Sequence, residues 1–146
     1  MTFDPTPDLL SSLTPRQVVL LSERDEALRR ALGRALSFSG FSVIPVPDLP
    51  RAAAYIEEGP DAGHEGSLPD VIVTDLPSWG PQRDAALSLV RRLSRRVPVV
   101  VLANGGDLPF FADGRASPMI EVLEKPVAPQ DLQAAVLRVH ARLRYH

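Results

Sequence analysis

The sequence predicts an α/β fold in which helices cover both faces of a parallel β-sheet. Three observations lead to this prediction. Short apolar segments alternate five times with segments whose apolar residues recur at helical spacing. The short segments are apolar at consecutive positions, which is typical of strands buried on both faces. The second of them contains Pro45, and proline is confined to edge strands because it lacks a backbone N–H.

The five expected strands are runs of aliphatic and β-branched residues. An edge position for the second run favours the strand order 2-1-3-4-5. The sequence therefore predicts a flavodoxin-like (βα)5 sandwich with a central five-stranded parallel sheet, whose crossover connections are right-handed. The expected strands cover residues 18–21, 41–46, 71–75, 98–102 and 119–123.

A helix is expected after each strand. Gly40 is a suitable residue to end the first helix, and Pro129 is suited to the first position of the last. The segment 108–116 is a weak helix because Pro109 and Gly114 interrupt it. The other expected helices cover residues 27–36, 49–58, 84–95 and 129–143. Residues 1–16, which are polar and contain several prolines, are expected to form a flexible tail, and residues 17–146 a single domain.

The composition argues against several classes of protein. The formal net charge is −2, whereas a nucleic-acid-binding domain usually has a basic face. The absence of cysteine excludes disulfides and thiol chemistry. The longest apolar run, Val97–Ala103, is too short to span a bilayer. The first residues lack the basic start and apolar core of a secretion signal, so the cytoplasm is the expected location.

Reactive side chains follow three of the expected strands. Glu23 follows the first strand, Asp75 ends the third, and Lys125, the only lysine in the chain, follows the fifth. Because ligands of such sheets bind beyond the carboxyl ends of the strands, where the strand order reverses, we expect these three residues to meet at one rim. Two carboxylates are suitable ligands for Mg²⁺, and a lysine suits a phosphoryl oxygen.

From about residue 17 to residue 143, the chain resembles the receiver domain of two-component response regulators. Residues 69–75 resemble the run that ends on the phospho-acceptor of that family, and residues 123–126, Leu-Glu-Lys-Pro, resemble its strand-five motif. The resemblance implies that the peptide bond before Pro126 is cis, which is uncommon for proline in general.

The resemblance also implies roles for the rim residues. Asp75 would accept a phosphoryl group from a histidine kinase or phosphotransfer protein. Glu23, Asp75 and the backbone carbonyl of Pro77 would bind Mg²⁺. Lys125 would neutralise the phosphoryl charge, since phosphoryl transfer depends mainly on positioning and electrostatics.

Several positions depart from the family pattern. Ser22 and Glu23 stand where the family has an acidic pair. The position of the switch hydroxyl falls on Ala103, and that of the switch aromatic on Val122. The segment 59–69 has the character of an insertion, rich in glycine and proline. The usual relay from the phosphoryl group to an aromatic side chain is therefore absent.

Two hypotheses follow, and the sequence leaves both open. The first is a stand-alone receiver phosphorylated on Asp75, which signals to a downstream protein, acts on no nucleic acid or membrane directly, and is no enzyme beyond self-phosphorylation and autodephosphorylation. The second is a pseudo-receiver, a protein interaction module whose conformation does not depend on phosphate and which binds Mg²⁺ weakly or not at all. A homodimer stays open in either case. An unrelated enzyme on the same fold ranks last, because no cofactor motif or nucleophile–base pair is recognisable.

Overall fold

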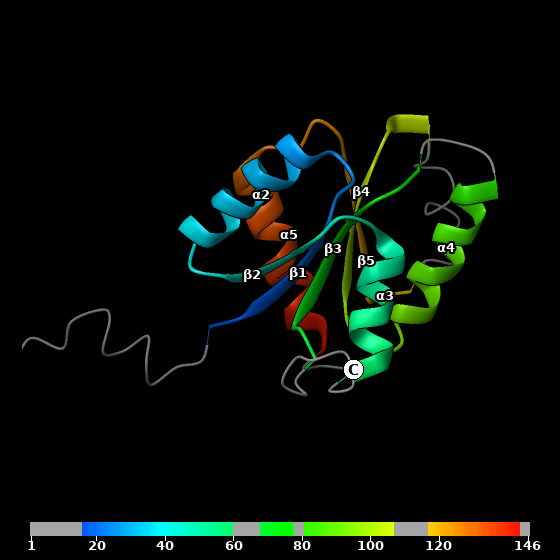
Figure 1. Ribbon diagram of the computed structural model, residues 1–146. Coiled ribbons are helices and arrows are strands. Elements are labelled where there is room, and N and C mark those ends of the chain that lie inside the picture. Colours follow the sequence, from blue (N-terminus) through cyan, green and yellow to red (C-terminus); the bar gives the residue numbers. More distant parts are fainter. Residues whose placement is uncertain (1–15, 60–67, 78–80, 107–116, 144–146) are drawn as a thin grey trace, which may run out of the picture.

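The computed structural model describes residues 16–59, 68–77, 81–106 and 117–143. Within these residues five parallel strands form one sheet in the order β2-β1-β3-β4-β5, and four helices cover it (Figure 1). The predicted flavodoxin-like order is confirmed. The strands are β1 (Val18–Ser22), β2 (Ser42–Val46), β3 (Val71–Asp75), β4 (Val99–Ala103) and β5 (Ile120–Glu124). The helices are α2 (Glu26–Phe38), α3 (Leu49–Glu58), α4 (Pro81–Leu93) and α5 (Pro129–Leu143).

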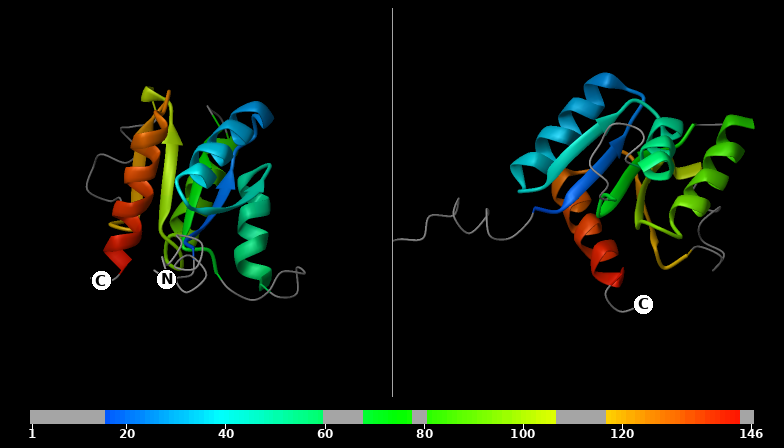
Figure 2. Two further views of the ribbon diagram at one scale, coloured as in Figure 1. Left: turned by 90° about the vertical axis from the view of Figure 1, so that its left-hand side faces the viewer. Right: turned by 60° about the horizontal axis from the view of Figure 1, so that its bottom comes forward.

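The helices form two layers, with α2 and α5 on one face of the sheet and α3 and α4 on the other (Figures 1 and 2). Consecutive strand residues point to opposite faces. In β1, Val19 and Leu21 belong to the core beneath α2 and α5, whereas Leu20 belongs to the core beneath α3 and α4. This double burial explains why the strands read as unbroken apolar runs.

The helix ends follow from local residues. The Asp25 side chain accepts a hydrogen bond from the backbone N–H of Leu28 at 3.2 Å and so caps α2. The helix ends at Phe38, and Gly40 has a φ of 98°, in the left-handed region that favours glycine. Asp48 caps α3 in the same way, through Arg51. These caps fix where the chain leaves β1 and β2.

The prediction of elements differs from the structure by small amounts. The helix α4 begins at Pro81 instead of 84, because proline is well suited to a first helical turn. The strands β4 and β5 each begin and end one residue later than predicted. Pro45 is exposed on β2, which lies at the sheet edge as predicted. In α2 the buried leucines are Leu32 and Leu36.

Three predicted features lie outside the described residues, wholly or in large part. They are the N-terminal tail, the insertion-like segment and the weak helix at 108–116. No helix in the described part of the chain is both long and apolar enough to cross a membrane.

We expect the α5 contact to carry a large share of the stability. Leu132 has no exposed surface, whereas Leu137 on the same helix is 45% exposed. Leu132→Ala should lower the free energy of unfolding by about 2–5 kcal/mol because it leaves a cavity, and Leu137→Ala should change it by no more than about 0.5 kcal/mol. Urea unfolding followed by circular dichroism measures both. Equal losses in the two variants would contradict the packing described above.

Candidate functional site

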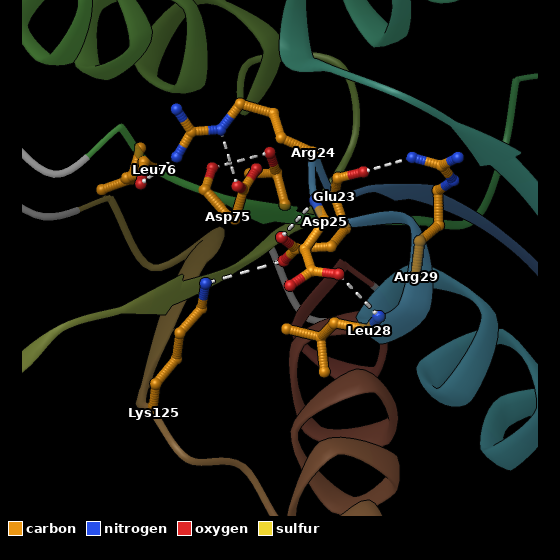
Figure 3. A network of polar contacts seen from close by, with 9 residues as sticks. Glu23, Arg24, Asp25, Leu28, Arg29, Asp75, Leu76 and Lys125 are labelled. Carbon is orange, nitrogen blue, oxygen red and sulfur yellow. Dashed lines mark hydrogen bonds and ion pairs between the residues drawn. The ribbon is translucent and has the colours of Figure 1, made fainter.

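The carboxyl ends of β1, β3 and β5 bring polar side chains together at one rim of the sheet (Figure 3). Glu23 lies one residue beyond β1, and Asp75 is the last residue of β3. Both are buried, with 2% and 3% of their surface exposed. Lys125 lies one residue beyond β5. Parallel pairing of the strands is what places these residues, distant in sequence, at a common edge.

Glu23, Asp75 and Lys125, which sequence reasoning expected to meet, do so. The Lys125 Nζ lies 3.6 Å from the Glu23 Oε2. Burial raises the pKa of the Glu23 carboxyl, and the neighbouring Asp75 carboxylate raises it further. The backbone N–H of Asp25 and the Lys125 ammonium lower this pKa, but they do not overcome the burial. We call Glu23 and Asp75 the carboxylate pair.

Arg24 is the residue that the sequence analysis missed. Its Nε donates to the Asp75 Oδ2 at 2.9 Å, and its Nη2 donates to the backbone carbonyl of Leu76 at 3.0 Å (Figure 3). The Arg24 side chain is 47% exposed, while that of Asp75 is 4% exposed. The partly exposed guanidinium therefore lies against a carboxylate that is itself almost fully buried. The sequence did contain one sign of this role, because Arg24 directly follows Glu23 in the segment that leaves the first strand.

The backbone around Glu23 is fixed by further hydrogen bonds. The N–H of Asp25 donates to the Glu23 Oε1 at 3.1 Å, and the Arg29 Nη1 donates to the Glu23 carbonyl at 2.7 Å. Because Asp25 also caps α2, the start of the helix and Glu23 share one loop. The Glu23 Oε2 is buried and has no hydrogen-bond partner in the structure. Within the described part of the chain, the cation paired with this oxygen is the Lys125 ammonium.

Of the positions that depart from the receiver pattern, Ser22 and Ala103 end their strands at the rim, whereas Val122 lies in the middle of β5. Ser22 is fully buried, and its Oγ has no hydrogen-bond partner in the structure. Ala103 ends β4 with 1% of its surface exposed, and its carbonyl accepts from the Lys125 N–H at 2.8 Å. Val122 is half-buried and packs against the core beneath α3 and α4. The peptide bond between Lys125 and Pro126 is cis, as the resemblance implies.

Pro77 and Asp75 line one cavity. The cavity has a volume of about 360 Å³ and is lined by Asp75, Arg24, Pro77 and residues of α3 and α4, including Leu49 and Leu89. Arg24 and Asp75 are charged residues of its lining, and Leu49 and Leu89 are apolar ones.

The residues at the rim do not fit a magnesium site as they are arranged. Mg²⁺ prefers several oxygen ligands in near-octahedral geometry. The described residues contain no group of three or more acidic or histidine side chains that could hold a metal ion. Ser22 adds no carboxylate, and the Asp75 Oδ2 already accepts from Arg24. Two carboxylates thus face two cations, Arg24 and Lys125, within the protein itself.

Comparison with known proteins shows which fold this is. No protein-family model and no curated protein matched the chain. Among solved structures, a response regulator receiver protein from Sinorhizobium medicae is 22% identical with a TM-score of 0.67, over 86% of this chain and 95% of its own. A response regulator receiver domain from Clostridium thermocellum is 20% identical with a TM-score of 0.69, over 88% and 98%. A Francisella receiver domain is 18% identical with a TM-score of 0.67, over 88% and 99%.

These similarities define the class of fold. The chain has the fold of response regulator receiver domains across almost the whole length of the solved examples. At this level of identity the likeness concerns the fold, and the chemistry of the rim has to be argued from the rim itself.

The raised pKa of Glu23 predicts a pH dependence of stability. A carboxyl whose pKa is higher in the folded than in the unfolded state binds protons more tightly when folded. Its contribution to stability is therefore complete below the ordinary value of 4.5 and is lost as the pH rises through the folded pKa. The free energy of unfolding of Glu23→Gln, relative to the unaltered protein, should rise over that window.

Urea titrations at a series of pH values would measure this difference. A matched control is Glu26→Gln, which removes an exposed carboxylate three residues away. If the two variants show the same pH profile, the prediction that burial raises the pKa of Glu23 is wrong.

Proposed function

We propose that this protein is a signalling protein of the receiver class, which accepts a phosphoryl group on Asp75. The observation that carries the proposal is the meeting of Asp75, Glu23 and Lys125 in one pocket at the carboxyl edge of the sheet. A carboxylate with a lysine and a second acid beside it, on this fold, is suited to accept a phosphoryl group. The donor would be a histidine kinase, a phosphotransfer protein or a small acyl phosphate.

The transfer needs only one carboxylate oxygen and nearby positive charge. An oxygen of Asp75 attacks phosphorus, the bond to the donor atom breaks, and the donor leaves with that electron pair. Lys125 and Arg24, the cations paired with the two carboxylates, can balance the charge of the phosphoryl oxygens. Asp75 is 3% exposed, so the donor would have to enter along the cavity beside Arg24 and Pro77.

A second candidate is a pseudo-receiver that binds a partner protein without phosphorylation. Two observations favour it. Arg24 already occupies the Asp75 Oδ2, and Ala103 offers no hydroxyl to a phosphoryl oxygen at the end of β4. In both cases the downstream partner would be a protein, because the chain has no strongly basic surface charge overall, with a net charge of −2.

Acetyl phosphate separates the two candidates. We expect incubation with acetyl phosphate to give a phosphoprotein, stable in acid and labile in base, that is absent from Asp75→Asn. Intact-protein mass spectrometry, with and without Mg²⁺, measures the adduct. Asp70→Asn is a matched control, because Asp70 lies at the opposite end of β3 and its Oδ2 accepts from the Val18 N–H. An adduct that persists in Asp75→Asn, or none in any sample, would reject phosphoryl acceptance at Asp75.

The missing switch hydroxyl predicts a gain of function. Ala103→Thr would place a hydroxyl at the end of β4. Lys125 is close by, because its N–H donates to the carbonyl of residue 103. A hydrogen bond to a charged group is worth about 1.5–3 kcal/mol. The new hydroxyl should therefore shift the equilibrium toward the phosphorylated form by about tenfold or more. The lifetime and the steady-state amount of the adduct measure this effect. A variant that folds normally but shows no change in either would contradict the assignment of this position.

A further inference from the structure

We propose that Arg24 is the resident cation of the carboxylate pair and takes the place at Asp75 that a divalent metal ion would need. This inference rests on the proposed function and names the regulation of the same site. Mg²⁺ would then have to displace a guanidinium that belongs to the protein. Phosphorylation at Asp75 would be controlled by whether Arg24 is held against the carboxylate or drawn away from it.

The contacts of Arg24 carry the proposal. Two of its nitrogens are used at once, the Nε on the Asp75 Oδ2 and the Nη2 on the Leu76 carbonyl. A guanidinium is a planar fork, and two hydrogen bonds to neighbouring residues fix its orientation as well as its position. Because Leu76 follows Asp75 directly, Arg24 clamps the end of β3 to the loop after β1.

The charges of the pocket support the same conclusion. Glu23 and Asp75 contribute two negative charges when ionised, and Arg24 and Lys125 contribute two positive charges. The pocket is therefore balanced by its own side chains. A divalent ion added to this set would meet two positive charges and a carboxylate oxygen that is already bonded. Ser22, which is neutral and buried, adds no further attraction for a metal.

The half-exposed position of Arg24 makes the arrangement reversible. The Arg24 side chain is 47% exposed, and ion pairs that solvent reaches are weak enough to break and form again. It also lines the 360 Å³ cavity beside Asp75. A phosphodonor or a partner that binds there with an anionic group would compete with Asp75 for the same guanidinium.

Metal binding in the absence of any phosphodonor tests this role. We would titrate the full-length protein and Arg24→Ala with MgCl₂ by isothermal titration calorimetry, and follow the melting temperature at each concentration. Removal of a hydrogen bond to a charged group changes an equilibrium by about tenfold or more, so Arg24→Ala should bind Mg²⁺ at least about tenfold more tightly. Its melting temperature should rise with MgCl₂ more than that of the unaltered protein, because a ligand stabilises the state that binds it.

Two further variants make the result specific. Arg30→Ala removes the same charge from α2 at a residue that pairs with Glu26 on the helix surface, and it should leave the affinity unchanged. Asp75→Asn combined with Arg24→Ala should lose the gain, because the metal would bind at Asp75. The proposal is overturned if Arg24→Ala binds Mg²⁺ no more tightly than the unaltered protein. It is also overturned if Arg30→Ala gains as much affinity for Mg²⁺, or if the double variant without Asp75 keeps the gain.

The outcome is independent of phosphorylation. If Arg24→Ala gains affinity for Mg²⁺ and no adduct forms with acetyl phosphate, phosphoryl acceptance fails and the role of Arg24 stands. If the adduct forms on Asp75 and Arg24→Ala gains no affinity, the role of Arg24 fails and phosphoryl acceptance stands.

Discussion

The close burial of Glu23 and Asp75 is the constraint on which the functional end of this protein depends. Two ionised acids in contact, each almost without exposed surface, are costly to a folded protein unless cations are near. The structure meets this cost with Lys125 on one side and Arg24 on the other. The raised pKa of Glu23 shows that the compensation is incomplete, because burial and Asp75 together outweigh the ammonium.

The sheet makes this pair possible by holding three strand ends in register. β1, β3 and β4 are buried on both faces, so their side chains leave little freedom for the backbone to shift. Ser22 pairs with Thr74 across β1 and β3, which sets Glu23 next to Asp75. A rigid apolar core thus supports a rim whose polar groups could not otherwise be kept together.

Fold and site depend on different kinds of residue in this chain. The chain has the fold of receiver domains although only about one residue in five is identical. Such low identity is sufficient because a parallel sheet covered on both faces requires mainly apolar positions and helix caps. The rim carries Asp75 at the end of β3 and Lys125 after β5, and with them Ser22, Arg24 and Ala103. The apolar core thus accounts for the fold, and the rim residues have to account for the chemistry.

The sequence by itself determined the strand order and the convergence of Glu23, Asp75 and Lys125. Apolar runs, the edge proline and the rule that strand ends share a rim were sufficient, since they depend only on backbone periodicity and topology. Element boundaries were less exact because a proline or a cap shifts a helix start by a turn.

Only the tertiary structure decided what Arg24 does. An arginine in a loop has many rotamers, and neither composition nor spacing indicates which carboxylate it will meet. Its place on Asp75 depends on the distance between the loop after β1 and the end of β3, and on the carbonyl of Leu76 that receives its second nitrogen. Long-range pairing brings those groups together, and for that physical reason the role of Arg24 was visible only in three dimensions, whereas that of Lys125 was not.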